Sequence, residues 1–277
     1  MSGVQPSGPT RLARAFARLR EHQEIGLFPY LMAGLPDVER SHALAHAALD
    51  AGADGFEIGV PFSDPLADGA TLQRANARAL AAGATLQTAL DLAHSIRVRA
   101  ADVPVVLMSY YNPLRQRGEV RFADDLAAID ADGVIVPDLP PEEAAEFLNA
   151  LRTRNLSLVP FAAPTSPIER IRSVADLDPE FIYCVALVGV TGARQDLSSS
   201  LGDFLGRVRK ETSAPLVVGF GISQPDHVRR VAELGAEGAI VASALSDLID
   251  RSPDPVAAAR DFLTQMKSAT RRAGVST

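Results

Sequence analysis

The chain is poor in cysteine and in aromatic residues, with one cysteine, no tryptophan and 5% aromatic residues among 277. Because Cys184 stands alone, no internal disulfide can form, and we expect a reducing, cytoplasmic setting. Hydrophobic residues make up 47% of the chain, so aliphatic side chains must supply most of the core. Cys184 itself lies within an apolar run and is expected to be a core residue rather than a nucleophile.

Long apolar runs and a surplus of basic residues are also missing. No run approaches the roughly 20 residues that a membrane helix needs, and the first ten residues carry no apolar signal segment. The net charge is −7, and no basic stripe is interleaved with aromatic residues. We therefore expect neither nucleic acid nor an anionic membrane as a partner. A phosphorylated small molecule is compatible with this charge, because backbone N–H groups at helix N-termini bind phosphate.

Metal-ligand patterns are absent too. His42 and His46 are four residues apart on a predicted helix, but no third ligand accompanies them, so we expect no metal site.

Short apolar runs bounded by turn residues alternate with segments of helical periodicity along the whole chain. The predicted strands are 27–32, 55–59, 103–109, 133–136, 156–161, 181–185, 216–219 and 239–241. The predicted helices are 11–20, 38–49, 71–80, 85–101, 122–129, 142–151, 168–174 and 227–234, with a short helical stretch that runs to Ile249.

Eight strand–helix repeats predict an α/β fold, a single (β/α)₈ TIM barrel. The helix at 11–20 is an extra N-terminal helix, and the helix at 85–101 is an extra helix after the second strand. We expect one barrel domain over residues 1–277, with residues 1–10 as an N-terminal tail. An open doubly wound sheet fits less well, because the first strand–helix turn has no dinucleotide-binding fingerprint.

Several helix ends carry local signals. Ser166 and Ser223 each precede a proline and an acid, which predicts two serine N-caps. The segments 50–54, 130–133 and 234–238 each place a glycine before the next strand, which predicts left-handed helix ends.

The segment from Phe56 to Gly69, FEIGVPFSDPLADG, is the most informative stretch of the chain. It puts Glu57 inside an apolar strand and Asp64 and Asp68 in the loop that follows. Burial of a carboxylate opposes its charged form and raises its pKa. An acid at a strand end, facing an acid in a loop, is typical of a general acid/base and an electrostatic stabiliser. The alternatives are a structural ion pair for Glu57 and a turn-forming role for Asp68.

Phosphate binding is indicated by three segments in the last third of the chain, at 189–194, 219–223 and 241–244. They follow the sixth, seventh and eighth predicted strands. Loops after the last two strands, with the N-terminus of a short extra helix, form the usual phosphate site of such barrels. Glycine lets the backbone approach the phosphate closely.

The motifs, taken in order, closely resemble the tryptophan synthase α subunit family over roughly residues 11–270. The segment from Glu57 to Gln73 is similar to the family signature. Further similar motifs are PYLMAG at 29–34, MSYYNP at 108–113, VPDLP at 136–140, APT at 163–165, GVTG at 189–192 and GFGIS at 219–223.

The resemblance implies a retro-aldol cleavage of indole-3-glycerol phosphate to indole and glyceraldehyde 3-phosphate. Glu57 would protonate indole C3 and help to remove the proton of the glycerol 3′-hydroxyl. Asp68 would accept the indole N–H, and Tyr183 would hydrogen-bond near the glycerol chain. The implied binding residues are Gly192, Gly221, Ala242 and Ser243 for the phosphate and Tyr30, Met108 and Phe220 for the indole ring.

The resemblance also implies a β-subunit partner in an α₂β₂ heterotetramer. That partner carries the pyridoxal phosphate, so this chain would need no cofactor. Asp64 and Thr191 would bond across two loops that close over the substrate. Loop residues around Pro61, Asn112 and Pro140 would face the partner.

The chain departs from the family pattern at Ala70, Ala186, Val188 and Ala242. None of these positions supplies a catalytic group, so the departures bear on rate, loop closure and coupling. Three alternatives follow: a standalone indole-3-glycerol-phosphate lyase, a non-catalytic barrel that only activates a β partner, and another phosphate-binding barrel. Retention of Glu57, Asp68 and Tyr183 together argues against the non-catalytic barrel, and the position of Glu57 within its motif argues against another phosphate-binding barrel.

Overall fold

The computed structural model describes residues 8–186, 194–219 and 221–272, without the side chains of residues 194–199. Its strands are β1 (Gly26–Met32), β2 (Phe56–Gly59), β3 (Val105–Met108), β4 (Gly133–Ile135), β5 (Ser157–Val159), β6 (Phe161–Ala162), β7 (Ile182–Val185), β8 (Leu216–Gly219) and β9 (Gly238–Val241). All of the strand pairs are parallel.

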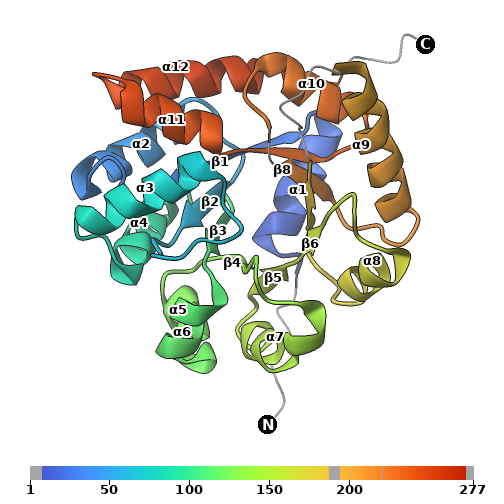
Figure 1. Ribbon diagram of the computed structural model, residues 1–277, viewed down its shortest axis with the longest axis horizontal. Helices are drawn as coiled ribbons and strands as arrows, with labels where there is room; N and C mark the ends of the chain where they lie inside the picture. Colours follow the sequence, from blue (N-terminus) through green and yellow to red (C-terminus); the bar gives the residue numbers. More distant parts are fainter. Residues whose placement is uncertain (1–7, 187–193, 220, 273–277) are drawn as a thin grey trace.

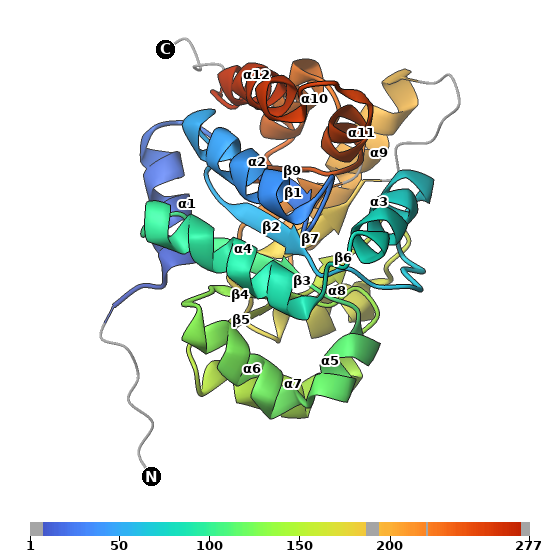
Figure 2. The same ribbon diagram turned by 90° about the vertical axis from the view of Figure 1, so that its left-hand side faces the viewer.

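The helices surround these strands (Figures 1 and 2). They are α1 (Arg11–Glu21), α2 (Val38–Asp50), α3 (Ala70–Ala81), α4 (Leu86–Arg99), α5 (Tyr111–Arg117), α6 (Glu119–Ala128), α7 (Ala145–Arg152), α8 (Ile168–Ala175), α9 (Arg194–Arg209), α10 (Pro225–Glu233), α11 (Ser243–Arg251) and α12 (Pro255–Ser268), with a 3₁₀ turn at Pro141–Glu143. Among the described residues, no helix combines the length and the apolar character needed to cross a membrane.

The sheet closes into a barrel through a strand that proline divides. The strand order runs β5-β4-β3-β2-β1-β9-β8-β7-β6, and β5 and β6 are separated in the chain only by Pro160. Proline has no N–H to donate, but the Pro160 carbonyl accepts the Tyr183 N–H at 2.9 Å. The predicted strand 156–161 is therefore one barrel strand in two pieces, and the predicted TIM barrel is confirmed, with α1 as the extra N-terminal helix and α4 as the extra helix after β2.

Three helices were not predicted, namely α5, α9 and α12. The prediction of Ser166 and Ser223 as helix N-caps is wrong. Helix α8 begins with Pro167 as its N-cap, and Ser166 Oγ instead accepts the Ala163 N–H at 3.0 Å. Helix α10 has Gln224 as its N-cap, one residue after Ser223.

The prediction of left-handed glycines at helix ends is confirmed in two of the three segments. Gly52 and Gly235 have φ values of +87° and +90°, as a left-handed residue requires. In the third segment Asp130 takes that conformation instead, with φ of +54°. Gly133 begins β4, where a Cβ would overlap the Ser157 carbonyl.

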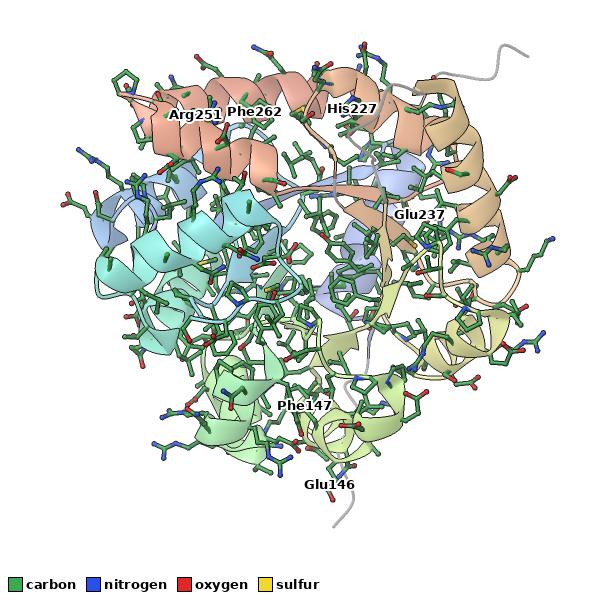
Figure 3. The ribbon with its side chains drawn as sticks, viewed as in Figure 1. Glu146, Phe147, His227, Glu237, Arg251 and Phe262 are labelled. Atoms are coloured by element: carbon green, nitrogen blue, oxygen red, sulfur yellow. The ribbon has the colours of Figure 1, made fainter. Side chains whose placement is uncertain are left out.

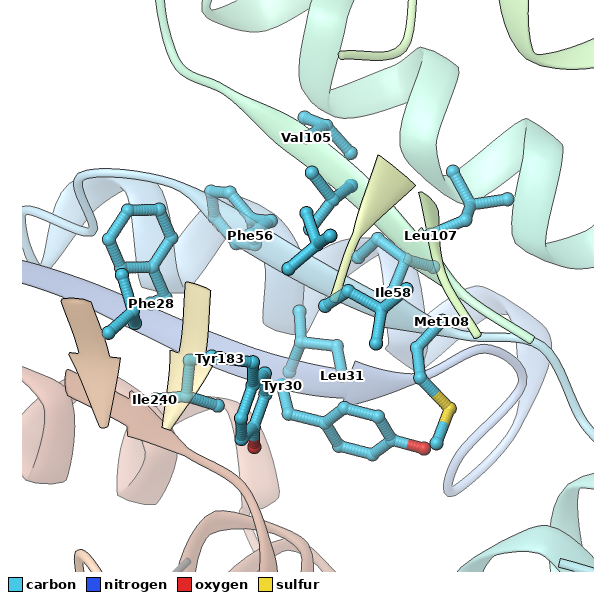
Figure 4. Packing of buried hydrophobic residues seen from close by; sticks show 14 of the residues in the cluster. Phe28, Tyr30, Leu31, Phe56, Ile58, Val105, Leu107, Met108, Tyr183 and Ile240 are labelled. Carbon is cyan, nitrogen blue, oxygen red and sulfur yellow. The ribbon is translucent and has the colours of Figure 1, made fainter. Parts of the chain in front are cut away.

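An aromatic cluster fills the lower end of the barrel, where the strands begin. Phe28 on β1 lies there, whereas Tyr30 and Met108 lie toward the other end (Figure 4). The Phe28 ring centroid is 5.9 Å from that of Phe16 on α1 and 6.2 Å from that of Phe181. Helix α1 thus covers this end of the barrel through Phe16.

Carboxylates lock neighbouring strands together at this lower end. The backbone N–H of an acid just before one strand donates to the carbonyl of a residue near the start of the neighbouring strand. The side chain of the acid accepts the N–H of that same residue. The pairs are Asp54 with Leu27, Asp132 with Val105 and Glu237 with Leu216, with side-chain bonds of 2.9, 2.7 and 2.8 Å.

Each of these acids also has a cation. Lys267 pairs with Asp54 at 2.7 Å, Arg97 with Asp132 at 2.7 Å, and Arg209 on α9 with Glu237 at 2.6 Å; Figure 3 shows Glu237 beside α9. A buried carboxylate is stable when it is both paired and hydrogen-bonded. These contacts fix the register of the strands that carry the site.

We predict that Asp132→Ala lowers the free energy of unfolding by about 3–5 kcal/mol, because it leaves the buried Arg97 guanidinium without its carboxylate. Urea titration followed by circular dichroism measures the loss. Asp102→Ala is the matched control, since Asp102 is 89% exposed and lies 3.9 Å from Arg14; it should change stability by less than about 0.5 kcal/mol. A loss below 1 kcal/mol in Asp132→Ala would contradict the role of this contact.

Candidate active site

A cavity of about 360 Å³ opens at the carboxyl ends of the strands. It contains every described member of the predicted catalytic and binding set, namely Glu57, Asp68, Tyr183, Tyr30, Met108, Gly221, Ala242 and Ser243. The other two binding residues, Gly192 and Phe220, lie outside the described residues. Eight positions spread over residues 30–243 therefore meet in one place.

Two tyrosines form much of the inner wall. Tyr30 on β1 pairs with Glu57 on β2 in the parallel register. A Cβ at Gly59 would overlap the Tyr30 hydroxyl, and one at Gly219 would overlap the Tyr183 hydroxyl. The two glycines therefore leave the space that the phenol groups occupy. Burial and the nearby acids hold the pKa of both tyrosines well above its ordinary value, so both hydroxyls stay neutral donors.

Glu57 is buried without a compensating charge. Its side chain is 4% exposed, and its Oε2 has no hydrogen-bond partner among the described residues. Burial, and then the charge of Asp68, raises the pKa of Glu57 from 4.5 to about 8. At neutral pH Glu57 is therefore a protonated acid, able to donate its proton to a bound molecule.

Asp68 is buried to a similar degree but has donors. It is 8% exposed, and Asn76 donates its Nδ2–H to Asp68 Oδ2 at 3.1 Å. Burial raises the pKa of Asp68 to about 6, while hydrogen bonds from Tyr110 and Asn76 act in the opposite direction. At pH 7 Asp68 is mostly ionised beside a protonated Glu57, and such separated pKa values divide the roles of a carboxyl pair.

Backbone N–H groups line the cavity where helix α11 begins. Helix α11 begins at Ser243, and no side chain caps it. Gly221, with φ of +74°, adds a position where only glycine is unstrained. No lysine or arginine is among the described residues that line the cavity. An anion at this end would be held by the helix N-terminus and by neutral donors.

The remaining predicted residues lie away from the cavity floor. Asp64 is exposed next to Ser63, whose hydroxyl it accepts, and its expected partner Thr191 lies outside the described residues. Of the expected partner-facing residues, Asn112 is exposed, Pro140 is partly exposed and Pro61 is buried.

Residues outside the site match their expected roles. Cys184 is fully buried in β7, and burial raises its pKa to about 12, as for a core thiol. His42 Nδ1 lies 3.0 Å from Ser95 Oγ, so this ring packs between α2 and α4, which lie side by side (Figure 2).

Asn76 and Tyr110, which both hydrogen-bond Asp68, were not predicted as site residues. A signal for Asn76 was present, because it falls on the buried face of α3 together with Leu72, Ala75 and Ala79. A polar residue on such a face needs a partner, and here that partner is the second acid of the site.

The raised pKa of Glu57 has a consequence for stability. The unfolded chain releases this proton near pH 4.5, and the folded chain releases it near pH 8. Between these values the folded state binds more protons, so its stability falls as the pH rises. We predict that, between pH 5 and 9, wild type loses a few kcal/mol more than Glu57→Gln, at about 1.4 kcal/mol per pKa unit. Urea titrations of both proteins across this range measure the difference, and parallel profiles would contradict the raised pKa.

Three comparisons place the chain among known proteins. A family profile described as tryptophan synthase alpha chain matches residues 16–273. The tryptophan synthase alpha chain of Roseiflexus sp. (strain RS-1) is 53% identical over 260 residues, which cover 93% of this chain and 99% of that protein.

Solved structures agree with the sequence match. Tryptophan synthase subunit alpha from Legionella pneumophila str. Paris superimposes with a TM-score of 0.87 at 32% identity, covering 95% of this chain and 99% of that one. A chain of M. tuberculosis tryptophan synthase, in its aminoacrylate-bound form, gives 0.86 at 30% identity and covers 95% and 100% of the two chains.

Proposed function

The chain belongs to the tryptophan synthase alpha chain family and cleaves indole-3-glycerol phosphate to indole and glyceraldehyde 3-phosphate, and we propose that Glu57, Asp68 and Tyr183 perform this cleavage. The observation that carries the assignment is the pair of buried acids in one cavity, with a pKa of about 8 for Glu57 and about 6 for Asp68. The reaction needs one proton donor and one fixed negative charge, and the pair supplies both at neutral pH.

Glu57 acts first as an acid and then as a base. Its proton goes to indole C3, which leaves a positive indoleninium ring. The Glu57 carboxylate then takes the proton of the glycerol 3′-hydroxyl. The bond between C3 and the carbinol carbon breaks, its electron pair returns to the ring, and the aldehyde of glyceraldehyde 3-phosphate forms. Glu57 ends protonated, as it began, so protons and electrons balance.

Asp68 and Tyr183 support this step from two sides. The Asp68 carboxylate accepts the indole N–H and stabilises the positive ring more strongly than the neutral substrate, which is how electrostatic catalysis lowers a barrier. Tyr183, buried against Phe161 with ring centroids 4.6 Å apart, presents its hydroxyl to the glycerol chain. Tyr30, Met108 and Phe220 enclose the indole ring.

The phosphate lies at the other end, on backbone N–H groups. We assign it to Gly192, Gly221, Ala242 and Ser243, with the positive end of the α11 dipole behind the last two. Ala242 keeps the N–H that a glycine would supply there.

We also propose a β-subunit partner, an α₂β₂ assembly and a cytoplasmic location. The partner holds the pyridoxal phosphate, and this chain needs no cofactor. Leu66, at the tip of the loop between β2 and α3, is 90% exposed, and Asn112 is exposed on α5; both are suited to a protein contact. Asp64 and Thr191 join the two loops when substrate is bound.

We predict that Glu57→Gln lowers the rate of indole formation by at least about 10²–10⁴-fold, because the amide cannot transfer a proton. Asp68→Asn should cost about 10²–10³-fold through the lost charge. Single-turnover assays of indole release measure both rates. Glu211→Gln, which removes an acid that pairs with Arg172 far from the cavity, should match wild type. If Glu57→Gln kept most of its turnover, the acid/base assignment would be wrong.

Indole release by the chain alone, and with an added tryptophan synthase β subunit, tests the partner. We expect slow release that rises at least tenfold with the partner, because the complex favours closure of the loops over the site. Fast release that ignores the partner would identify a standalone lyase, with Ala70, Ala186 and Val188 as the first positions to examine.

A further inference from the structure

Asn76 is a buried amide whose oxygen and two N–H hydrogens each have a partner. It is 2% exposed and lies on α3. Its Oδ1 accepts the Phe62 N–H at 2.9 Å, and its Nδ2 donates to Asp68 Oδ2 at 3.1 Å and to the Leu72 carbonyl at 3.0 Å. An amide has one acceptor and two donor hydrogens, and each of them has a partner here.

One side chain thus ties both ends of the loop between β2 and α3 to the helix. Phe62 lies near the start of that loop and Asp68 near its end. A carboxylate on a loop would otherwise sample several rotamers. Asn76 is held in place by helix α3, so its hydrogen bond fixes the position of Asp68 Oδ2.

Among the described residues, the groups that stabilise the charge on Asp68 are neutral donors, Tyr110 and Asn76. The titratable groups that face it are Tyr110, after β3, Glu57 on β2, Tyr30 on β1 and Tyr183 on β7. None of them is a cation. The Tyr110 hydroxyl also accepts the Ala67 N–H at 3.0 Å, so it bonds the backbone of the same loop as well. The Asn76 amide donates one of its hydrogens directly to the Asp68 carboxylate.

On the basis of the function proposed above, we propose that Asn76 is a positioning residue, whose amide holds the Asp68 carboxylate in its ionised, indole-facing place. A donor bond to a carboxylate favours its charged form. Loss of that donor should therefore shift the ionisation of Asp68 to higher pH. The indole ring would then bind well only in more alkaline solution.

The test uses 3-(indol-3-yl)propyl phosphate, an unreactive ligand without the glycerol hydroxyls, and a Glu57→Gln parent in which Asp68 is the remaining buried acid of the pair. Calorimetric affinities from pH 5 to 9 give the acid midpoint of binding. In the parent we expect it near 6, the pKa of Asp68, once the titration of the ligand's own phosphate, which also falls at about pH 6, is subtracted with the profile of Glu57→Gln/Asp68→Asn. Adding Asn76→Ala should raise the midpoint by at least one pH unit and weaken binding at pH 7 at least fivefold.

Gln73→Ala is the matched control. Gln73 also lies on α3 and also bonds Asp68, but its Nε2 donates to the backbone carbonyl, at 3.0 Å. If general loosening of the loop were the cause, both variants would shift the midpoint. We expect the Gln73→Ala midpoint to stay within 0.3 pH units of the parent.

Asn76→Asp gives a second test with the shape of the side chain kept. The new carboxyl can donate to Asp68 only while it is protonated, since two close carboxylates share one proton. The affinity for the ligand should therefore be kept at pH 6 and should fall toward pH 9. In Asn76→Ala, by contrast, the affinity should rise over the same range.

Two kinds of result would overturn the proposal. The first is a failure of either Asn76 variant: a midpoint in Asn76→Ala that coincides with those of the parent and of Gln73→Ala, or an Asn76→Asp profile that follows the parent. The second is a parent that binds the ligand equally at all pH values. Only the second would also remove Asp68 from its proposed contact with the indole N–H, so the two failures can be told apart.

Discussion

Exclusion of water from the Glu57 carboxyl group is the constraint on which the site depends. The closed barrel places this group on its inner wall, between neighbouring strands and above the aromatic cluster of Phe16, Phe28 and Phe181. No donor compensates its Oε2 among the described residues, so the group keeps its proton at neutral pH. A more open sheet would hydrate the carboxylate, return its pKa toward that of an ordinary acid, and remove the proton that we propose for the cleavage.

The same desolvation acts at the other end of the strands, where it raises the pKa of Asp132, but there cations and a backbone donor oppose it. Asp132 is as buried as the site acids, but Arg97 and Arg11 pair with it at 2.7 and 2.5 Å, and the Val105 N–H donates to it. Cations and a backbone donor offset the cost of burying the Asp132 charge. Glu57 has no such partners, so it stays protonated at neutral pH and can donate its proton. Buried ion pairs thus lie at the lower end, whereas the described residues that line the cavity at the upper end include no lysine or arginine.

The sequence predicts the barrel well because its strands are short apolar runs with turn residues on both sides, a pattern that local composition determines. Glu57 could be identified for the same reason, as one acid in an apolar strand. The break at Pro160, the helix at Tyr111–Arg117 and the role of Ser166 could not, since each depends on a partner that only the folded chain supplies. Ser166 serves the turn at Ala163 rather than a helix, and Asn76 serves Asp68, eight residues earlier in the chain. The roles of Gly192, Phe220 and Thr191 stay predictions.

In the function we propose, the distribution of charge in the cavity also orients the substrate. Asp68 is negative at one end, and the described lining residues include no lysine or arginine that would offset it. A phosphate dianion is repelled from that end and is favoured at the N-terminus of α11, where unpaired N–H groups carry partial positive charge. The indole N–H, a donor, is favoured at Asp68. With the two ends of the substrate held by these opposite preferences, the proposed mechanism puts the bond that breaks beside Glu57. In that mechanism the orientation of the substrate and its cleavage depend on the same two acids, and a cation at Asp68 would weaken both orientation and cleavage.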